Sequence, residues 1–133
     1  MIVQPYFLLS DEDKALAQRL WEENMKEPWR VYDKADMFAV IHDDKIVGGF
    51  AVYRDNSEGV KGLFCSGWAG RHLKVPADRI LQRLADSVGD VYFKTDKRAA
   101  KFLLEKIGQK VKNTERFGYY IIRGNKNGKT KKG

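Results

Sequence analysis

The chain has 133 residues, 43% of them hydrophobic and 12% aromatic, which is enough for one well-filled core and too few for two ordinary domains. No apolar run approaches the roughly 20 residues that a membrane-spanning helix needs, and the first residues, MIVQPYFLLSDED, lack the features of a signal peptide. The single cysteine, Cys65, excludes an internal disulfide and a multi-cysteine zinc site. We therefore expect one soluble, cytoplasmic domain over residues 1–123, with no membrane partner.

The net charge of +7 is concentrated in two segments. Residues 124–133 contain four lysines and no acid, and they predict a flexible basic tail. These lysines are Lys126, Lys129, Lys131 and Lys132. Residues 97–112 carry six basic side chains against one acid, Glu105. A solvated helix face with a disordered tail accounts for both segments, and an electrostatic footprint for nucleic acid is the alternative.

The first part of the chain predicts a short extended segment followed by a helix. Ser10, with Asp13 three residues later, resembles a capping box that begins the helix after the apolar segment IVQPYFLL. An apolar stripe at helical spacing then runs from Leu16 to Met25. Pro28 ends the helix, because a proline cannot continue the hydrogen-bond ladder.

Two turn-forming acids divide the next apolar segment into a hairpin. Residues 37–55, MFAVIHDDKIVGGFAVYRD, are interpreted as two strands joined at Asp43 and Asp44. Gly48 and Gly49 fall inside the second strand, where glycine is unfavourable unless a bulge or a close backbone neighbour requires it.

The second half of the chain alternates strands and helices. A strand is expected over about residues 60–66, a helix from Pro76 to Val88, and a strand over residues 91–95. Asp96 is the predicted cap of a second helix that ends at Gly108. The residues expected to face inward on this helix are Ala99, Ala100, Leu103, Leu104 and Ile107. A strand, a turn and a strand follow over residues 109–124.

Neither the cysteine nor the first histidine has the surroundings of a reactive site. Cys65 lies in an apolar run, so it is interpreted as a small buried hydrophobe rather than a nucleophile. His42 is followed by Asp43 and Asp44, but the two histidines of the chain are far apart in sequence, which favours a solvated turn. We expect no metal site.

The order of the predicted elements resembles the GNAT N-acetyltransferase superfamily over about residues 2–123. The segments DDKIVGGFAVYRD and VYFKTDKRAAKFLLEKIGQKV carry the most specific part of the resemblance. It implies an α/β fold of GNAT type, in which a mixed, mostly antiparallel sheet is flanked by helices, and acetyl-CoA as the cofactor. The pantetheine chain would pair with the strand at Leu63, Phe64 and Cys65. The pyrophosphate would meet the loop that contains Arg71, His72 and Lys74.

The chain departs from the family at two positions of this implied site. The family's pyrophosphate loop usually contains closely spaced glycines, but no glycine lies between Arg71 and Pro76, and Pro76 has no N–H to donate. Many members place a tyrosine, the acid that protonates the departing thiolate, where this chain has Leu104. The resemblance therefore implies a degenerate acyl-CoA site, and we expect acetyl-CoA to bind weakly.

These departures favour a GNAT-like protein that acts by binding another protein. The basic tail and the pattern KFLLEKIG also resemble the GNAT-like internal virion proteins of short-tailed phages, which implies a structural or host-interaction component of the host cytoplasm or the virion. An active acetyl-CoA-dependent N-acetyltransferase, with phosphates held by Arg71, His72 and Lys74, is one alternative. A nucleic-acid-binding accessory protein that uses the basic helix and tail is the other.

Overall fold

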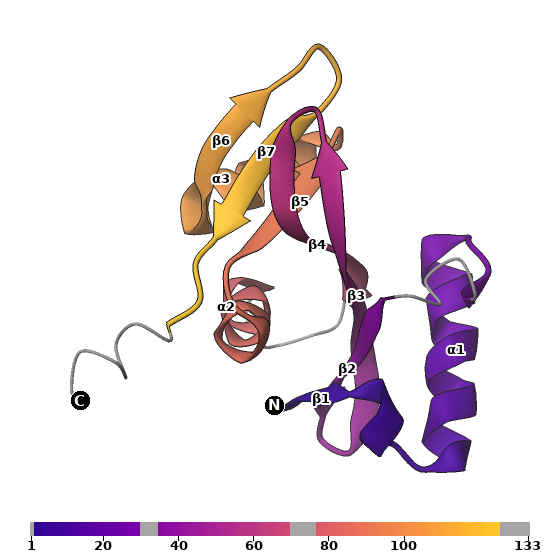
Figure 1. Cartoon of the computed structure of the whole chain (residues 1–133). Coiled ribbons are helices and arrows are strands. Elements are labelled where there is room, and N and C mark those ends of the chain that lie inside the picture. The colour runs from indigo at the N-terminus through magenta and orange to yellow at the C-terminus, as the bar shows by residue number, and fades with distance from the viewer. Residues whose placement is uncertain (1, 30–34, 70–76, 126–133) are drawn as a thin grey trace. The chain divides into compact units, whose positions relative to one another are not determined.

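The computed structural model describes residues 2–29, 35–69 and 77–125 (Figure 1). The order of elements agrees with the sequence analysis. The elements are β1 (Ile2–Pro5), a 3-10 turn η1 (Tyr6–Leu8), α1 (Asp11–Met25), β2 (Asp36–His42), β3 (Lys45–Ser57), β4 (Val60–Ala69), α2 (Ala77–Val88), β5 (Val91–Thr95), α3 (Arg98–Ile107), β6 (Gln109–Asn113) and β7 (Gly118–Ile122). No helix of this described part is long and apolar enough to cross a membrane.

The described strands form a seven-stranded sheet in the order β1-β2-β3-β4-β5-β7-β6. The pairs β1–β2, β2–β3, β5–β7 and β6–β7 are antiparallel, whereas β4 and β5 are parallel and share one register pair, Phe64 with Tyr92. The chain divides into two packing units, and β3 and β4 each contribute residues to both. The first unit comprises Met1–Arg54 and Cys65–Pro76, and the second comprises Asp55–Phe64 and Ala77–Gly133.

In the first unit, Trp21 of α1 is 1% exposed and lies against β3, where a β-carbon on Gly49 would be 3.5 Å from its Cε3. The helix begins as predicted, because the Asp13 N–H donates to the Ser10 hydroxyl oxygen at 3.1 Å. The glycine pair in β3 is explained by close neighbours: a β-carbon on Gly48 would lie 2.9 Å from the Trp68 carbonyl oxygen, and one on Gly49 would lie 3.0 Å from Trp68 Nε1. The predicted need for a close neighbour at these glycines is confirmed.

The β2–β3 hairpin of this unit also agrees with the prediction. His42 pairs with Lys45, so Asp43 and Asp44 form the two-residue turn between the strands. Both acids have positive φ, 51° and 61°. This is the conformation that matches the twist of a tight hairpin and that aspartate tolerates better than most residues.

In the second unit, α2 and α3 pack on β7, and α3 also packs on β6 (Figure 1). The core of this unit contains buried residues of β4, α2, β5, α3 and β7, and β7 is buried from end to end, whereas β6 is exposed. Leu104 is the buried residue of α3, and it is 4% exposed. Ala99, which we expected to face inward, is exposed, because five helical residues at about 100° each place it some 140° around the axis from Leu104.

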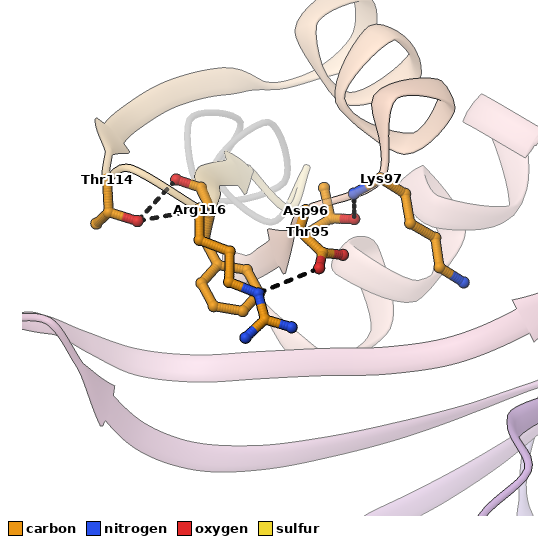
Figure 2. A network of polar contacts seen from close by, with 6 residues as sticks. Thr95, Asp96, Lys97, Thr114 and Arg116 are labelled. Atoms are coloured by element: carbon orange, nitrogen blue, oxygen red, sulfur yellow. Dashed lines mark hydrogen bonds and ion pairs between the residues drawn. The ribbon is translucent and has the colours of Figure 1, made fainter.

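The predicted Asp96 cap of α3 is wrong. The helix begins at Arg98 with Lys97 as its N-cap, and no side chain caps it. The Asp96 carboxylate instead accepts from Arg116 Nε at 3.4 Å, and the Thr95 hydroxyl oxygen accepts the Lys97 N–H at 3.1 Å (Figure 2). The Asp96 carboxylate is therefore paired with Arg116 of the β6–β7 turn and does not provide the helix cap that the local sequence predicts.

Candidate functional site

The strand segment predicted to hold pantetheine, Leu63 to Cys65, lies in β4. The Phe64 side chain is 1% exposed and packs in the second unit, with its ring 5.5 Å from that of Tyr92 and 6.4 Å from that of Tyr119. Leu63 is half-buried, and Cys65 is 5% exposed. These side chains are used for packing, so a ligand along β4 would have to be held by backbone groups.

The C-terminal half of β4 offers such groups. In the first unit the strand order is β1-β2-β3-β4, so Cys65–Ala69 forms the last strand of that unit's described sheet. Its outer edge carries backbone N–H and C=O groups without a further strand within the described unit. An extended molecule with amide groups can pair with an edge of this kind by strand addition. The Ser66 hydroxyl of β4 lies 3.0 Å from the Tyr53 hydroxyl of β3, so it is already hydrogen-bonded within the protein.

Cys65 has the properties predicted for a buried hydrophobe. Its thiol is free, and burial raises its pKa well above the usual range. Because the thiolate is the nucleophilic form of cysteine, this raised pKa keeps the group unreactive near neutral pH. The interpretation of Cys65 as a packing residue is confirmed.

The position at which the resemblance expects an acid is occupied by an apolar core residue. Leu104 is buried in α3, and its carbonyl oxygen accepts the N–H of Gly108, the residue that ends the helix. The following residue, Gln109, is exposed at the start of β6. Leu104 cannot exchange a proton, so α3 supplies no general acid at this position.

A cluster that sequence reasoning missed lies next to this position. The Tyr120 hydroxyl donates to Glu105 Oε1 at 3.3 Å, and Lys110 Nζ lies 3.2 Å from the same oxygen. Burial, and then the negative charge of Glu105, raise the pKa of Tyr120, while Lys110 opposes the shift. The one signal in the sequence was the isolation of Glu105 as the single acid among the basic residues 97–112.

A second polar cluster joins the β3–β4 turn to β5 and β7 within the second unit. The Ser57 hydroxyl lies 2.8 Å from the Tyr119 hydroxyl, and Lys94 Nζ donates to Ser57 Oγ at 3.4 Å. Lys112 of β6 donates to the carbonyl oxygen of Glu58 in the turn. These bonds fix the turn and satisfy the hydroxyl of Tyr119, which is 1% exposed.

The remaining predicted site residues lie outside the described residues. These are Arg71, His72 and Lys74 of the predicted pyrophosphate loop, and the tail residues Lys126, Lys129, Lys131 and Lys132. The missing glycine cradle and the flexibility of the tail therefore stay predictions. Among the described residues, no group of three or more histidine, cysteine and carboxylate side chains is placed to hold a metal ion. His42 Nε2 lies 3.5 Å from Asp43 Oδ2.

Comparison with known proteins identifies relatives in fold only. No protein-family model matches the chain, and no curated protein matches it. The crystal structure of Campylobacter jejuni N-acetyltransferase PseH in complex with acetyl coenzyme A matches with 15% identity and a TM-score of 0.56, over 92% of this chain and 97% of that one. A second PseH crystal structure matches with 14% identity and the same TM-score, over 92% of this chain and 96% of that one. At this identity the likeness shows the fold, which is the GNAT-type α/β fold predicted from the sequence.

Proposed function

We propose that this chain is a non-catalytic binding protein built on the GNAT fold, in which a degenerate site takes acyl-CoA weakly. The observation that carries the proposal is Leu104, which is 4% exposed at the position where the resemblance expects the acid. In the acyl transfer of this family an amine attacks the thioester carbonyl, the C–S bond breaks, and a proton donor in reach assists the departure of the thiolate. An apolar side chain at that position removes the donor.

The backbone of β4 supports weak cofactor binding. The outer edge of Cys65–Ala69 can pair with the amides of a pantetheine chain, which would hold an extended ligand without any side-chain contact. When bound, acetyl-CoA supplies an activated acyl thioester. The chain's own Cys65 does not take up that acyl group, because its thiol is buried and its pKa is raised.

The biological setting proposed for this binding protein is a phage-type structural or host-interaction component with a protein partner. Its support is the sequence resemblance of KFLLEKIG and the basic tail to internal virion proteins of short-tailed phages. An active N-acetyltransferase is the second candidate, and its support is the strand edge in β4 together with a fold shared with an N-acetyltransferase crystallised with acetyl coenzyme A.

Calorimetry and thermal unfolding with acetyl-CoA separate the two candidates. A ligand that binds only the folded state stabilises it by RT ln(1 + [L]/Kd), so 1 mM acetyl-CoA with a micromolar Kd would raise the stability by about 4 kcal/mol. We expect a shift below about 0.5 kcal/mol, which corresponds to a Kd near or above 1 mM. Micromolar affinity, or release of free CoA thiol in the presence of a primary amine, would overturn the proposal.

Variants of the predicted phosphate loop identify the source of any binding. Arg71→Ala combined with Lys74→Ala should abolish a residual calorimetric signal, because charge-assisted phosphate contacts contribute about 1.5 to 3 kcal/mol each. The matched control is Lys61→Ala combined with Arg79→Ala, which removes the same charge from exposed positions of β4 and α2. If both pairs weaken binding equally, the binding is a non-specific effect of charge.

A further inference from the structure

The outer face of α3 exposes an aromatic ring. The Phe102 side chain is 62% exposed, although it lies in the middle of a helix whose other side is buried at Leu104. Two helical residues at about 100° each separate the two side chains by some 200° around the axis, so they lie on opposite faces. The surface around Phe102 is therefore distinct from the position of the missing acid.

One cation contacts this ring, and two more lie near it along the helix. Lys106 Nζ lies 4.3 Å from the centroid of the Phe102 ring, one helical turn after it. Arg98 is exposed and lies four residues before Phe102 on the same face, and Lys101 is half-buried and directly precedes Phe102, about 100° around the axis. Among the described residues, Arg98, Lys101 and Lys106 form no ion pair. We call Arg98, Lys101, Phe102 and Lys106 the α3 basic face.

The one carboxylate on this helix is already neutralised. Glu105 holds Lys110 at 3.2 Å and accepts from the Tyr120 hydroxyl, so it does not offset the cations of the α3 basic face. The segment 97–112 has six cations, of which Lys110 is paired with Glu105 and Lys112 donates to the Glu58 carbonyl oxygen. The other four are Lys97 and the three cations of the α3 basic face, and they form no ion pair with any described residue. Such a surface attracts polyanions.

We propose that the α3 basic face binds single-stranded nucleic acid, with one base stacked on Phe102 and the neighbouring phosphates held by Arg98, Lys101 and Lys106. Exposed aromatic rings between cations are the elements by which proteins hold single strands without sequence preference. A duplex keeps its bases stacked internally and would leave the ring of Phe102 without a role. The proposal is independent of acyl-CoA binding, because it concerns the opposite face of α3.

An acidic protein segment is the other polyanion that the cations of the α3 basic face could bind. The exposed apolar surface of α3 and β6 is too small for a stable protein interface. A stable protein interface buries about 800 Å² on each partner around an apolar centre. On α3 and β6 the exposed large apolar side chains are Phe102 and Val111. Val111 lies at the register irregularity of β6, between Lys110 and Lys112. An irregularity flanked by lysines discourages the addition of another strand at a sheet edge.

Fluorescence anisotropy with a labelled 20-nucleotide oligothymidylate tests the proposal on the full chain. Phe102→Ala should weaken binding about five- to 150-fold at every salt concentration, because stacking contributes 1–3 kcal/mol per base. Phe102→Leu should weaken it similarly, since leucine keeps the apolar surface and removes the ring, while Phe102→Tyr should bind like the parent. Circular dichroism checks that each variant is folded, which the exposure of Phe102 leads us to expect.

A series of charge-removing variants distinguishes binding at the α3 basic face from non-specific electrostatic attraction. The α3 triple variant consists of Arg98→Gln, Lys101→Gln and Lys106→Gln. Its matched control removes the same charge from exposed residues elsewhere in the second unit and consists of Lys61→Gln, Arg79→Gln and Arg83→Gln. The slope of log K against log salt should fall by about 2 in the α3 triple and by much less in the control.

Three results would overturn the proposal. The first is unchanged affinity in both Phe102→Ala and Phe102→Leu. The second is an equal loss of affinity in the α3 triple and its control. The third is binding of a polyglutamate peptide of matched charge that is as tight as the oligothymidylate and insensitive to Phe102, which would identify an acidic protein segment as the partner.

Discussion

Replacement of Leu104 by alanine tests whether Leu104 is the core residue of α3, the assignment on which the proposed function depends. The side chain is 4% exposed, so nearly all of its transfer free energy contributes to stability. Three carbon groups are lost, at about 0.8 kcal/mol each, which gives about 2.4 kcal/mol before any cavity forms. Incomplete collapse of the site can add up to about 2 kcal/mol. We therefore expect Leu104→Ala to lower the free energy of unfolding by about 2 to 5 kcal/mol, a large part of the 5–15 kcal/mol typical of a domain.

Urea unfolding followed by circular dichroism measures this loss, and two neighbouring substitutions serve as controls. Leu103 is half-buried, so Leu103→Ala should have a smaller effect. Phe102 is 62% exposed, so Phe102→Ala should change stability by less than about 1 kcal/mol. The reasoning is refuted if Leu104→Ala loses no more stability than Leu103→Ala at an unchanged m-value. In that case Leu104 is not a core residue, and the assignment of the missing acid to this position fails with it.

Three further predictions concern other parts of the chain. Gly67→Ala should destabilise the protein by about 1 to 3 kcal/mol in scanning calorimetry, because the added β-carbon would lie 2.3 Å from Phe50 Cδ1 and 2.4 Å from the Gly49 carbonyl oxygen. The raised pKa of Tyr120 makes the folded state hold its proton above about pH 10, where the unfolded state releases it, so this contribution to stability is present below pH 10 and is lost as the pH rises further. Tyr120→Phe should accordingly flatten the fall of stability in an alkaline urea series, and an unchanged profile would contradict the assignment. Deletion of residues 126–133 should leave stability within about 0.5 kcal/mol and reduce the salt slope of oligonucleotide binding by up to about 3, so equal slopes in filter binding would exclude the tail from nucleic-acid contact.

The features that were predictable from sequence depend on neighbours in the chain. The Ser10 cap and the turn at Asp43 and Asp44 follow from local hydrogen bonding and backbone preferences, and both occur as predicted. The seven-stranded GNAT-type fold follows from the order of such local signals together with the family resemblance.

The features that were not predictable join residues far apart in sequence. Asp96 pairs with Arg116, twenty residues later, and does not cap the helix, and Glu105 of α3 accepts a hydrogen bond from Tyr120 of β7. No periodicity or spacing in the sequence indicates which cation reaches a given carboxylate. The single domain over residues 1–123 and the degenerate loop at Arg71 both stay predictions.

The interleaving of the two packing units limits how the chain can be divided. The path crosses from one unit to the other after Arg54, after Phe64 and after Pro76, so neither unit is a continuous stretch of polypeptide. A fragment that ends anywhere between these crossings leaves both units incomplete. Genetic recombination that exchanged one unit between relatives would therefore need several breakpoints, two of them inside the paired strands β3 and β4.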